Sequence, residues 1–493
     1  MGTAPQTVDL SFGRPRIFGD DLAPPRQAFF AVIPAALAFF GMLSWVLGND
    51  FGFVLASVVA TAAGLYTLWG WLFRKAPTRF STILGMSLLL GYGGGAMNTW
   101  VMLPRGQLSV AAAMGMDAGV LARGIGAVLL SSALLYCLGE IFEKPIFGRD
   151  FHFFIDGRTR ALVYAGTLAM IAGYVTHTIG FLGASATGGR LNPAASFLTW
   201  LYIPVTVISV TAFLVAPQRW AKVLCGISSV ILLLMLSTLG RRVAIYLGVE
   251  ILLIMGLTSY RWKGRIFQKV LVVAGLAAVI VVTSLMFMLF RIAGWGTRNP
   301  QQATVTKRVE LAHKMFQRGD AYAIATSSTE ENLQTRTFVL KFFASVLEGS
   351  SRTRPALGED VIQQAEITIP SFLYPEKDRS FSEEELVDQQ FGYGFGDEAN
   401  SILTGGATDF GLLGALIYPL LLVALMRIIY DIAARCFGVV PLMFIALTLI
   451  NTSLQTEIGM AGYFATLRVL FFFGLVIAGF MVFPSLRMRT DRY

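Results

Sequence analysis

Runs of about 20 predominantly apolar residues recur along most of the chain, and they constrain its fold more than any motif does. An α-helix needs about this length to cross the roughly 30 Å hydrocarbon core of a bilayer. The expected fold is therefore an all-α polytopic membrane protein. Twelve spans are predicted, at residues 28–47, 51–73, 80–103, 124–142, 161–183, 194–216, 221–239, 243–260, 266–290, 411–426, 437–455 and 464–486.

The composition excludes several other classes of protein. Only 14% of the residues are charged and 55% are hydrophobic, whereas soluble domains carry roughly 25% charged residues. A water-soluble enzyme, a disordered chain and a disulfide scaffold are therefore excluded. Cys137, Cys225 and Cys436 fall in or beside apolar runs and match no metal-ligand spacing. Zinc and redox chemistry are accordingly not indicated.

The basic residues predict the orientation of the spans. With a cytoplasmic N-terminus, the inside segments hold 21 Lys and Arg residues and the short outer loops hold five. Cytoplasmic loops are enriched in these residues, so both termini are expected in the cytoplasm. This distribution accounts for the net charge of +9, and no nucleic-acid partner is expected. The predicted organisation is a tail (1–27), nine spans (28–291), a large outer loop (292–410), three spans (411–486) and a second tail (487–493).

The outer loop has a composition of its own. Residues 292–409 hold 17 of the 30 acidic residues and 11 of the 39 basic residues. A loop of this length in a compact protein is usually functional. Two amphipathic helices are expected in it, with apolar faces formed by Val305, Val309, Ala312 and Phe316 and by Phe338, Phe342, Val346 and Leu347.

An acidic run in the loop is interpreted as the start of a helix. Ser382 and Glu385 have the spacing of a capping box, in which each side chain binds the other residue's backbone N–H. Glu383 and Glu384 stand between them. A solvated helix start is favoured here over a metal site.

Charged residues in or near the spans are candidate functional groups, because charge at mid-bilayer costs roughly 2.5–3.5 kcal/mol. Arg241 and Arg242 open the eighth span on its outer side. Two guanidinium groups there can bind a diphosphate bidentately, although ordinary snorkelling to the interface also explains them. Arg291 and Arg468 lie near the outer ends of other spans. Each is either a second phosphate ligand or the partner of an acid such as Glu457.

Two titratable residues lie inside the predicted spans. Glu250, near the middle of the eighth, belongs either to a proton path or to a structural hydrogen bond. His177, in the outer half of the fifth, is expected to be a packing residue, and no Ser/His/Asp set accompanies it.

The end of the loop is rich in glycine and polar residues. It contains Ile369-Pro370-Ser371-Phe372-Leu373-Tyr374-Pro375-Glu376-Lys377, then Gly392-Tyr393-Gly394-Phe395-Gly396-Asp397-Glu398-Ala399-Asn400-Ser401, then Asp409-Phe410-Gly411-Leu412-Leu413-Gly414. Glycines allow a ligand to approach the backbone closely. Asp409 is either the N-cap of the tenth helix or a catalytic group.

These stretches resemble the bacterial oligosaccharide repeat-unit polymerases of the Wzy type and the related O-antigen ligases. The resemblance covers the layout of about a dozen spans and one late periplasmic loop. It rests on Pro370…Pro375-x-Lys377, Asn400-Ser401 and Gly411-x-x-Gly414, on Arg241 after Ser237…Gly240, and on Arg336 in the loop. The ligases carry a His just before the Asn, where this chain has Ala399, and this departure makes a ligase less favoured.

The resemblance implies a GT-C-like bundle in the bacterial inner membrane and a glycosyl transfer at its periplasmic face. The donor would be a polyprenyl-diphosphate-linked glycan, and the acceptor another repeat unit. No metal, nucleotide sugar or other cofactor is implied. Chain-length regulators and flippases are the protein partners it suggests. The substrate-binding residues would be Arg241, Arg242, Arg336, Arg291, Arg468, Lys377 and Asn400, and the base Glu398, Asp397 or Asp409.

Three other functions remain open from the sequence, one of which is a scaffold or assembly subunit of an envelope complex. A transporter or lipid-linked glycan flippase would also have twelve spans and would use Glu250, although no internal repeat is visible. A ligase-type transferase would share the periplasmic site.

Overall fold

The computed structural model describes most of the chain as α-helix, and no strand occurs in the part that it describes. That part comprises residues 27–74, 78–101, 114–146, 157–175, 193–215, 218–239, 246–252, 266–295, 305–320, 338–369, 381–393, 400–437 and 439–482, with residues 109, 111, 323, 373 and 374. The all-helical fold class expected from the apolar runs is thus observed there.

Within the described residues, helices occur at the positions of the predicted spans, but α17 begins nine residues before the predicted span 411–426 and ends ten residues after it. The apolar ones are α1 (Gln27–Leu47), α2 (Asp50–Arg74), α3 (Phe80–Leu88) with the π-helical turn η2 (Leu89–Gly93) and α4 (Gly94–Val101), α6 (Ala118–Phe142), α7 (Gly157–Val175), α8 (Pro193–Val215), α9 (Arg219–Leu239), α11 (Ile266–Trp295), α17 (Ile402–Cys436), α18 (Val439–Leu454) and α19 (Met460–Val482). Residues 246–252 are also helical.

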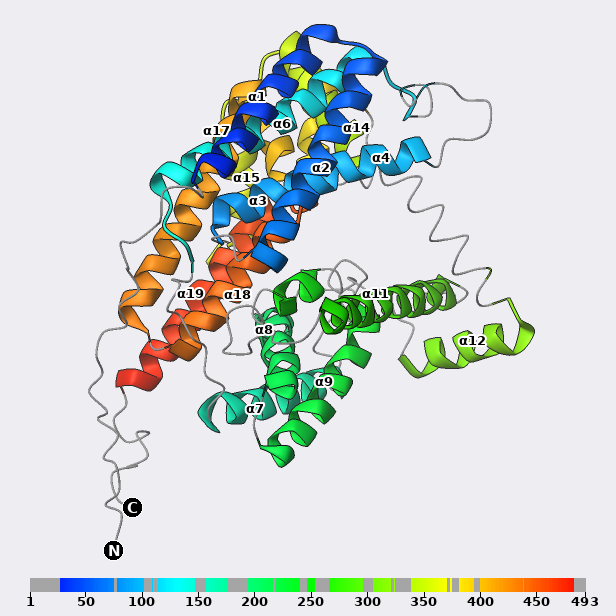
Figure 1. The fold of residues 1–493 in the computed structure, drawn as a ribbon, viewed down its shortest axis with the longest axis vertical. Coiled ribbons are helices and arrows are strands. Elements are labelled where there is room, and N and C mark those ends of the chain that lie inside the picture. The colour runs from blue at the N-terminus through cyan, green and yellow to red at the C-terminus, as the bar shows by residue number, and fades with distance from the viewer. Residues whose placement is uncertain are drawn as a thin grey trace, which may run out of the picture.

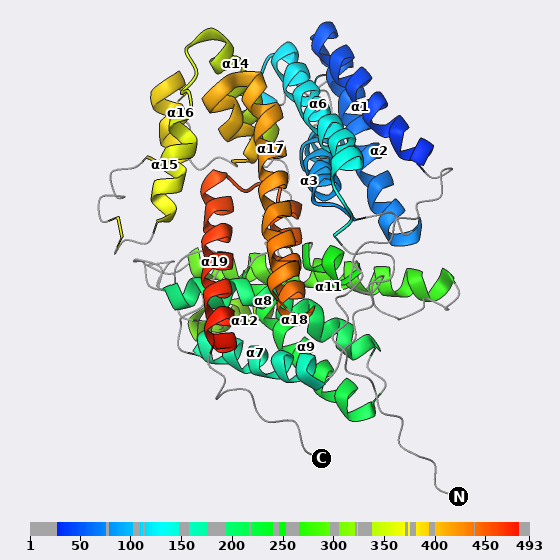
Figure 2. The ribbon, with the colours of Figure 1, turned by 90° about the vertical axis from the view of Figure 1, so that its left-hand side faces the viewer.

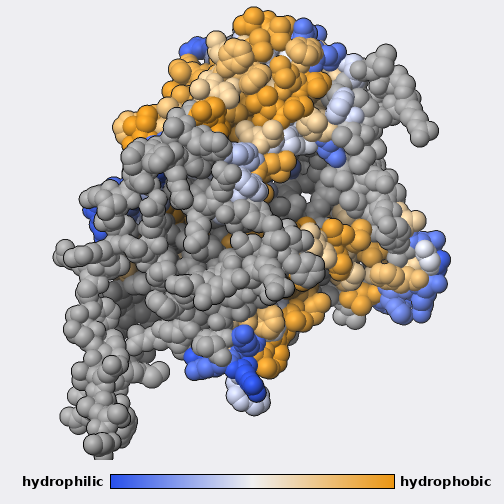
Figure 3. Space-filling model, viewed as in Figure 1, coloured by the Kyte–Doolittle hydropathy of each residue, from blue (hydrophilic) through white to orange (hydrophobic). Residues whose placement is uncertain are grey.

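Among the described residues, four helices are long and apolar enough to cross a membrane: Asp50–Trp71, Phe80–Asn98, Ala118–Phe142 and Ile402–Cys436. Six further apolar helical stretches are shorter than this. Large apolar side chains such as Phe39, Val46 and Leu421 are exposed on α1 and α17, and Figure 3 shows apolar surface over much of the upper part of the molecule. Exposed apolar surface of this kind indicates association with a membrane.

The first helices form a bundle around α3, all of whose residues are buried. Helices α1 and α6 cross closely at two glycines, since a Cβ on Gly41 would lie 3.0 Å from the carbonyl oxygen of Gly126. Small residues permit such close crossings between apolar helices. Near this crossing the Ser44 hydroxyl donates a hydrogen bond of 2.8 Å to the carbonyl of Ala122.

The start of α3 is capped by a carboxylate from the end of α6. Glu143 accepts hydrogen bonds from the backbone N–H groups of Phe80 and Ser81, at 2.7 and 3.0 Å. The buried Arg79 guanidinium pairs with Glu140 and donates to the carbonyl oxygen of Glu143. The buried charges are therefore paired with each other, and the Glu143 carboxylate also satisfies the first N–H groups of α3. Buried charges need such partners.

A second group of helices lies below the first in Figure 1: α7, α8, α9 and α11. Helix α8 packs against α7 and α9, and α11 packs against α9. Contacts of α8 with α18 and α19 connect this group to the C-terminal helices.

Residues 292–410, predicted as the outer loop and called the outer segment below, supply four more helices. These are α12 (Val305–Arg318), α14 (Phe338–Arg352), α15 (Glu359–Thr368) and α16 (Glu383–Phe391). Both predicted amphipathic helices are present. Phe342, Val346 and Leu347 of α14 are buried, as their pattern predicted. On α12, Ala312 is buried, whereas Val309 and Phe316 are exposed. The side chains of Val305 and Phe338 lie outside the described part.

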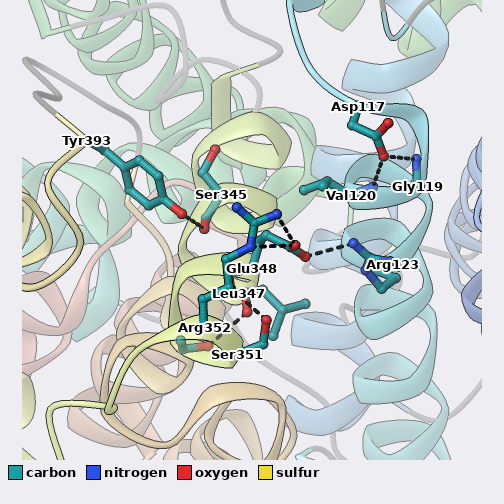
Figure 4. Close-up of polar contacts among 11 residues, drawn as sticks. Asp117, Gly119, Val120, Arg123, Ser345, Leu347, Glu348, Ser351, Arg352 and Tyr393 are labelled. Carbon is teal, nitrogen blue, oxygen red and sulfur yellow. Dashed lines mark hydrogen bonds and ion pairs between the residues drawn. The ribbon is translucent and has the colours of Figure 1, made fainter.

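Two helices of the outer segment, α14 and α15, pack on the apolar bundle. Helix α14 contacts α6 and α17, and α15 contacts α17 and α19. Figure 2 shows α15 and α16 side by side near α17 and α19. An ionic contact adds to this packing: Arg123 of α6 donates to Glu348 of α14 at 2.7 Å. In Figure 4 the carboxylate of Glu348 lies between Arg123 and Arg352.

Candidate functional site

The N-terminus of α17 lies among buried polar side chains, including Ser401 and Thr404. The Ser401 hydroxyl accepts hydrogen bonds from the backbone N–H groups of Leu403 and Thr404, at 3.1 and 3.2 Å, and so caps the helix. It shares a further hydrogen bond of 2.5 Å with the phenol of Tyr92. Tyr92 lies in the π-helical turn η2, and such turns are frequent at functional sites.

A break interrupts α17 shortly after its start. Phe410 and Gly411 have non-helical dihedral angles, and Gly411 has a φ of 61°. The chain on the two sides of the break is in close contact, because a Cβ on Gly406 would lie 2.4 Å from the carbonyl oxygen of Gly414. Glycine is therefore required at these positions, and the predicted Gly411-x-x-Gly414 stretch is the hinge of a broken helix.

Asp409 lies at this break and caps a different helix. Its carboxylate accepts hydrogen bonds from the backbone N–H groups of Gly358, Asp360 and Val361, at 2.9 to 3.1 Å. The Tyr418 hydroxyl donates a fourth, at 2.7 Å. The expectation that Asp409 caps the tenth helix is therefore wrong: it lies inside α17, which Ser401 caps, and it satisfies the first N–H groups of α15.

Two further carboxyl groups lie against the first turns of α17. Asp360 and Glu383 are both buried, and the described part of the chain offers no hydrogen-bond partner to Asp360 Oδ2 or Glu383 Oε1. Both oxygens are within 3.6 Å of the position that a Cβ would take on Gly405. The bare backbone of Gly405 therefore makes room for two carboxyl groups that come from α15 and α16.

These two carboxyl groups hold protons more tightly than ordinary ones. Burial, followed by the charge of Asp409, raises the pKa of Asp360 to about 8. Burial, followed by the charge of Asp360, raises the pKa of Glu383 well above its ordinary range. Like charges close together in a dry environment have this effect because they cannot both ionise. The pair can therefore take up or release a proton near neutral pH.

The capping box predicted at the start of α16 is confirmed. Ser382 Oγ accepts from the Glu385 N–H, and the Glu385 carboxylate accepts from the Ser382 N–H. The interpretation of the acidic run as a solvated helix start is wrong for Glu383, which is only 3% exposed. Its carboxyl group accepts a backbone hydrogen bond from Met460, at the start of α19. Within the described residues no group of three or more His, Cys, Asp and Glu side chains is arranged to hold a metal.

Asn400 joins the same cluster. Its amide donates to Glu384 Oε1 at 2.8 Å. A Cβ on Gly459 would lie 2.4 Å from Glu383 Oε2 and 3.2 Å from the Cβ of Asn400, so these two side chains meet beside that glycine. Of the predicted substrate-binding residues, Asn400 is the one that the structure brings to the acidic pair.

Arg468 lies nearby in α19, but its side chain binds the C-terminal end of α15. Its guanidinium donates to the carbonyl oxygen of Thr368 at 2.6 Å and is half-buried. The start of α15 is thus held by Asp409 and its end by Arg468.

Most of the other predicted site residues lie outside the described residues. These are Arg241, Arg242, Arg336, Lys377, Asp397 and Glu398, and also His177. The backbone of Arg291 belongs to α11, but its side chain is not described.

Glu250 is fully buried, as expected for a residue inside a bundle. Neither of its carboxyl oxygens has a partner at hydrogen-bond distance, although the side chain of Asn451 on α18 lies close enough to interact with it. The Asn451 amide oxygen instead accepts from Gln455 at 2.7 Å.

Sequence reasoning missed Asp360 and the burial of Glu383. Both stand at helix starts, where an acidic residue is the ordinary choice. The one available signal was the pair Gly405-Gly406, three positions before Asp409, since paired glycines mark a close approach of other groups to the backbone.

Comparison with known protein families, with curated proteins and with solved structures finds no match to this chain. The chemistry of the site is therefore argued from its own geometry.

Proposed function

We propose that this chain is a multi-pass glycosyltransferase of the bacterial inner membrane. It polymerises polyprenyl-diphosphate-linked oligosaccharide repeat units into a cell-surface polysaccharide by a metal-independent transfer at the periplasmic face. About twelve helices span the membrane, both termini are cytoplasmic, and the segment 292–410 is periplasmic.

The packing of α14 and α15 on the apolar helices supports this proposal most. A polar segment docked on a hydrophobic bundle suits a substrate with a lipid carrier and a hydrophilic glycan. The carrier can lie against the apolar helices while the sugars contact the polar segment. The acidic cluster beside α17 lies where these two parts of the molecule meet.

The reaction transfers a glycan from its diphosphate carrier to a hydroxyl group of the next repeat unit. The bond from the anomeric carbon to the diphosphate breaks, and a bond from the same carbon to the acceptor oxygen forms. Cations stabilise the negative charge that develops on the leaving diphosphate. Arg241, Arg242, Arg336 and Arg291 supply them in this proposal, with Lys377 and Asn400 as further substrate contacts.

A carboxylate takes the proton of the acceptor hydroxyl. Asp409 is poorly suited to this role, because four donors already bind its carboxylate. Asp397 and Glu398 therefore become the first candidates for the base. They lie two and three positions before Asn400 in the chain, and Asn400 belongs to the acidic cluster.

A lipid-linked glycan flippase is the second candidate, and Glu250 favours it. Glu250 is a fully buried carboxyl group whose described polar neighbour is the Asn451 side chain, and an ionisable group inside a membrane bundle marks a proton or ion pathway by default. The broken helix α17 also suits a transporter, because discontinuous helices form their binding sites.

A ligase-type transferase is the third candidate and differs from a polymerase only in its acceptor. It would move a finished glycan chain to another lipid. A purified protein that elongates repeat units without such an acceptor is a polymerase.

The decisive experiment uses the purified chain in bilayer nanodiscs with lipid-linked single repeat units, a chelator and no nucleotide sugar. We expect a ladder of longer glycans on a gel. A protein that moves the repeat unit across the bilayer of proteoliposomes but never lengthens it would contradict the proposal.

Cells distinguish the candidates through the intermediate that accumulates. Arg241→Ala or Arg242→Ala is expected to abolish polymer and to leave single repeat units on the outer face. Arg219→Ala, which removes an exposed arginine at the start of α9, is the matched control and is expected to retain polymer. Accumulation of repeat units on the inner face would favour a flippase, as would complete loss of polymer in Glu250→Gln at a normal protein level.

A further inference from the structure

A basic cavity lies at the end of α17 that is remote from the acidic cluster. It has a volume of about 240 Å³, and its charged lining residues are Lys144, Arg427, Asp431 and Arg435. This is many times the roughly 10–15 Å³ of such volume that one water molecule needs. The cavity can therefore hold a group of the size of a lipid phosphate.

The wall of the cavity is rigid. Arg427 makes two contacts with the Asp431 carboxylate, at 2.8 and 3.0 Å, and donates to the carbonyl oxygen of Lys144 at 2.5 Å. Its guanidinium also lies 5.5 Å from the ring centre of Tyr430. The Tyr430 hydroxyl in turn donates to the carbonyl of Ile146. A ligand would therefore meet side chains that are already held in position.

The cavity keeps an excess of positive charge. Arg427 and Asp431 neutralise each other, whereas the exposed Arg435 adds a formal charge at its mouth, where Lys144 also lies. The described part of the chain provides no hydrogen-bond or ion-pair partner for the Arg435 guanidinium. Its donors are thus available to a phosphate, which guanidinium groups bind bidentately.

The surroundings of the cavity are apolar. Phe142 lines it and is 78% exposed, and Ile141, Ile428 and Ile432 are exposed close by in the chain. Cationic groups beside exposed apolar side chains fit an amphipathic ligand better than a free anion, because its acyl chains would cover the isoleucines. Basic pockets between membrane helices on the cytoplasmic side bind anionic headgroups in this way.

We propose that this cavity binds the headgroup phosphate of an anionic phospholipid of the inner leaflet. The site is separate from the proposed transferase site. On the part of α17 that follows its break, residues 412 and 427 are about 22 Å apart at 1.5 Å per residue, which is most of the roughly 30 Å hydrocarbon core. The bound lipid ties the end of α6 to the end of α17.

The test uses the full chain in detergent, titrated with phosphatidylglycerol, phosphatidylcholine or inorganic phosphate while thermal unfolding is followed. Phosphatidylglycerol is expected to raise the midpoint, and phosphatidylcholine and inorganic phosphate at equal concentration are not. Native mass spectrometry counts the retained lipid molecules. Equal effects of the two lipids, or of phosphate and phosphatidylglycerol, would overturn the proposal.

Charge-removing variants locate the site. Lys144→Gln with Arg435→Gln is expected to bind phosphatidylglycerol about thirtyfold more weakly, since each cation near a lipid surface contributes about 1 kcal/mol. Arg219→Gln with Lys222→Gln removes the same charge from exposed positions of α9 and is expected to bind normally. Arg435→Gln alone removes none of the contacts that Arg427 makes in the cavity. This variant is therefore expected to fold normally and to bind phosphatidylglycerol more weakly. Unchanged binding in both cavity variants would refute the assignment.

Discussion

The hydroxyl of Tyr418 donates a hydrogen bond of 2.7 Å to the carboxylate of Asp409 across the break in α17. The same carboxylate holds the start of α15. One buried side chain thus connects the two parts of a broken apolar helix with a helix of the polar outer segment. This connection explains how the outer segment keeps a defined position on the bundle.

Asp409→Ala is expected to destabilise the docking of α15. Three N–H groups would lose their acceptor, two of them buried, and each buried unsatisfied group costs about 1–3 kcal/mol. Hydrogen exchange should show lost protection at Asp360 and Val361. Tyr418→Phe is the matched control, because it removes one donor and leaves the cap, so protection at those amides should persist. Equal protection in the two variants would mean that the cap is unimportant.

The pH dependence of stability should report the buried acid pair. The pKa of Asp360 is raised to about 8, so the folded protein binds a proton between pH of about 4 and about 8 that the unfolded chain has released. Stability therefore falls as pH rises through this window. Thermal unfolding of the solubilised chain measures the effect.

Asp360→Asn should flatten this pH profile, because the amide does not titrate. The remaining titratable groups that face the site are Glu383, Glu384 and Asp409. Glu359→Gln, which changes an exposed acid at the neighbouring position, should leave the slope unchanged. A profile that is as steep in Asp360→Asn as in the unmodified protein would reject the assignment.

Gly406→Ala is expected to disturb the break in α17. The new Cβ would lie 2.4 Å from the carbonyl oxygen of Gly414 and within 2.9 Å of further backbone atoms, which cannot move aside as a flexible side chain can. Overpacking of this kind costs about 1–3 kcal/mol. Gly94→Ala is the control, since nothing lies within 4 Å of its Cβ position. The two unfolding midpoints should differ by several degrees.

Exchanging a glycine of α6 and an alanine of α14 that face each other tests how α14 packs on α6. A Cβ on Gly124 would lie 2.8 Å from the Cβ of Ala344. Gly124→Ala should therefore loosen α14 and expose the outer segment to limited proteolysis. Adding Ala344→Gly removes the colliding atom and should restore protection, despite a helix-propensity cost of about 1 kcal/mol.

Gly275→Ala, where no atom lies within 4 Å, should leave the protease sensitivity of the outer segment unchanged. The contact is not essential for docking if Gly124→Ala behaves in the same way as this control.

Local patterns predicted the helices and many of their ends. Apolar runs indicated α1, α2, α6 and α18 to within a few residues, because lipid or a core must cover every side of such a helix. The capping box at Ser382 could also be predicted from the sequence, because both of its hydrogen bonds join residues that are three positions apart.

The sequence by itself determined the helical class and the polar composition of residues 292–409, because each depends on composition or on spacing within a few turns. Only the tertiary structure decided which carboxylates are buried and what they bind. Asp409 and Gly358 are 51 positions apart, and Tyr92 and Ser401 are 309 apart. Contacts between residues so far apart in the sequence follow from how the helices pack, and no local sequence pattern predicts them.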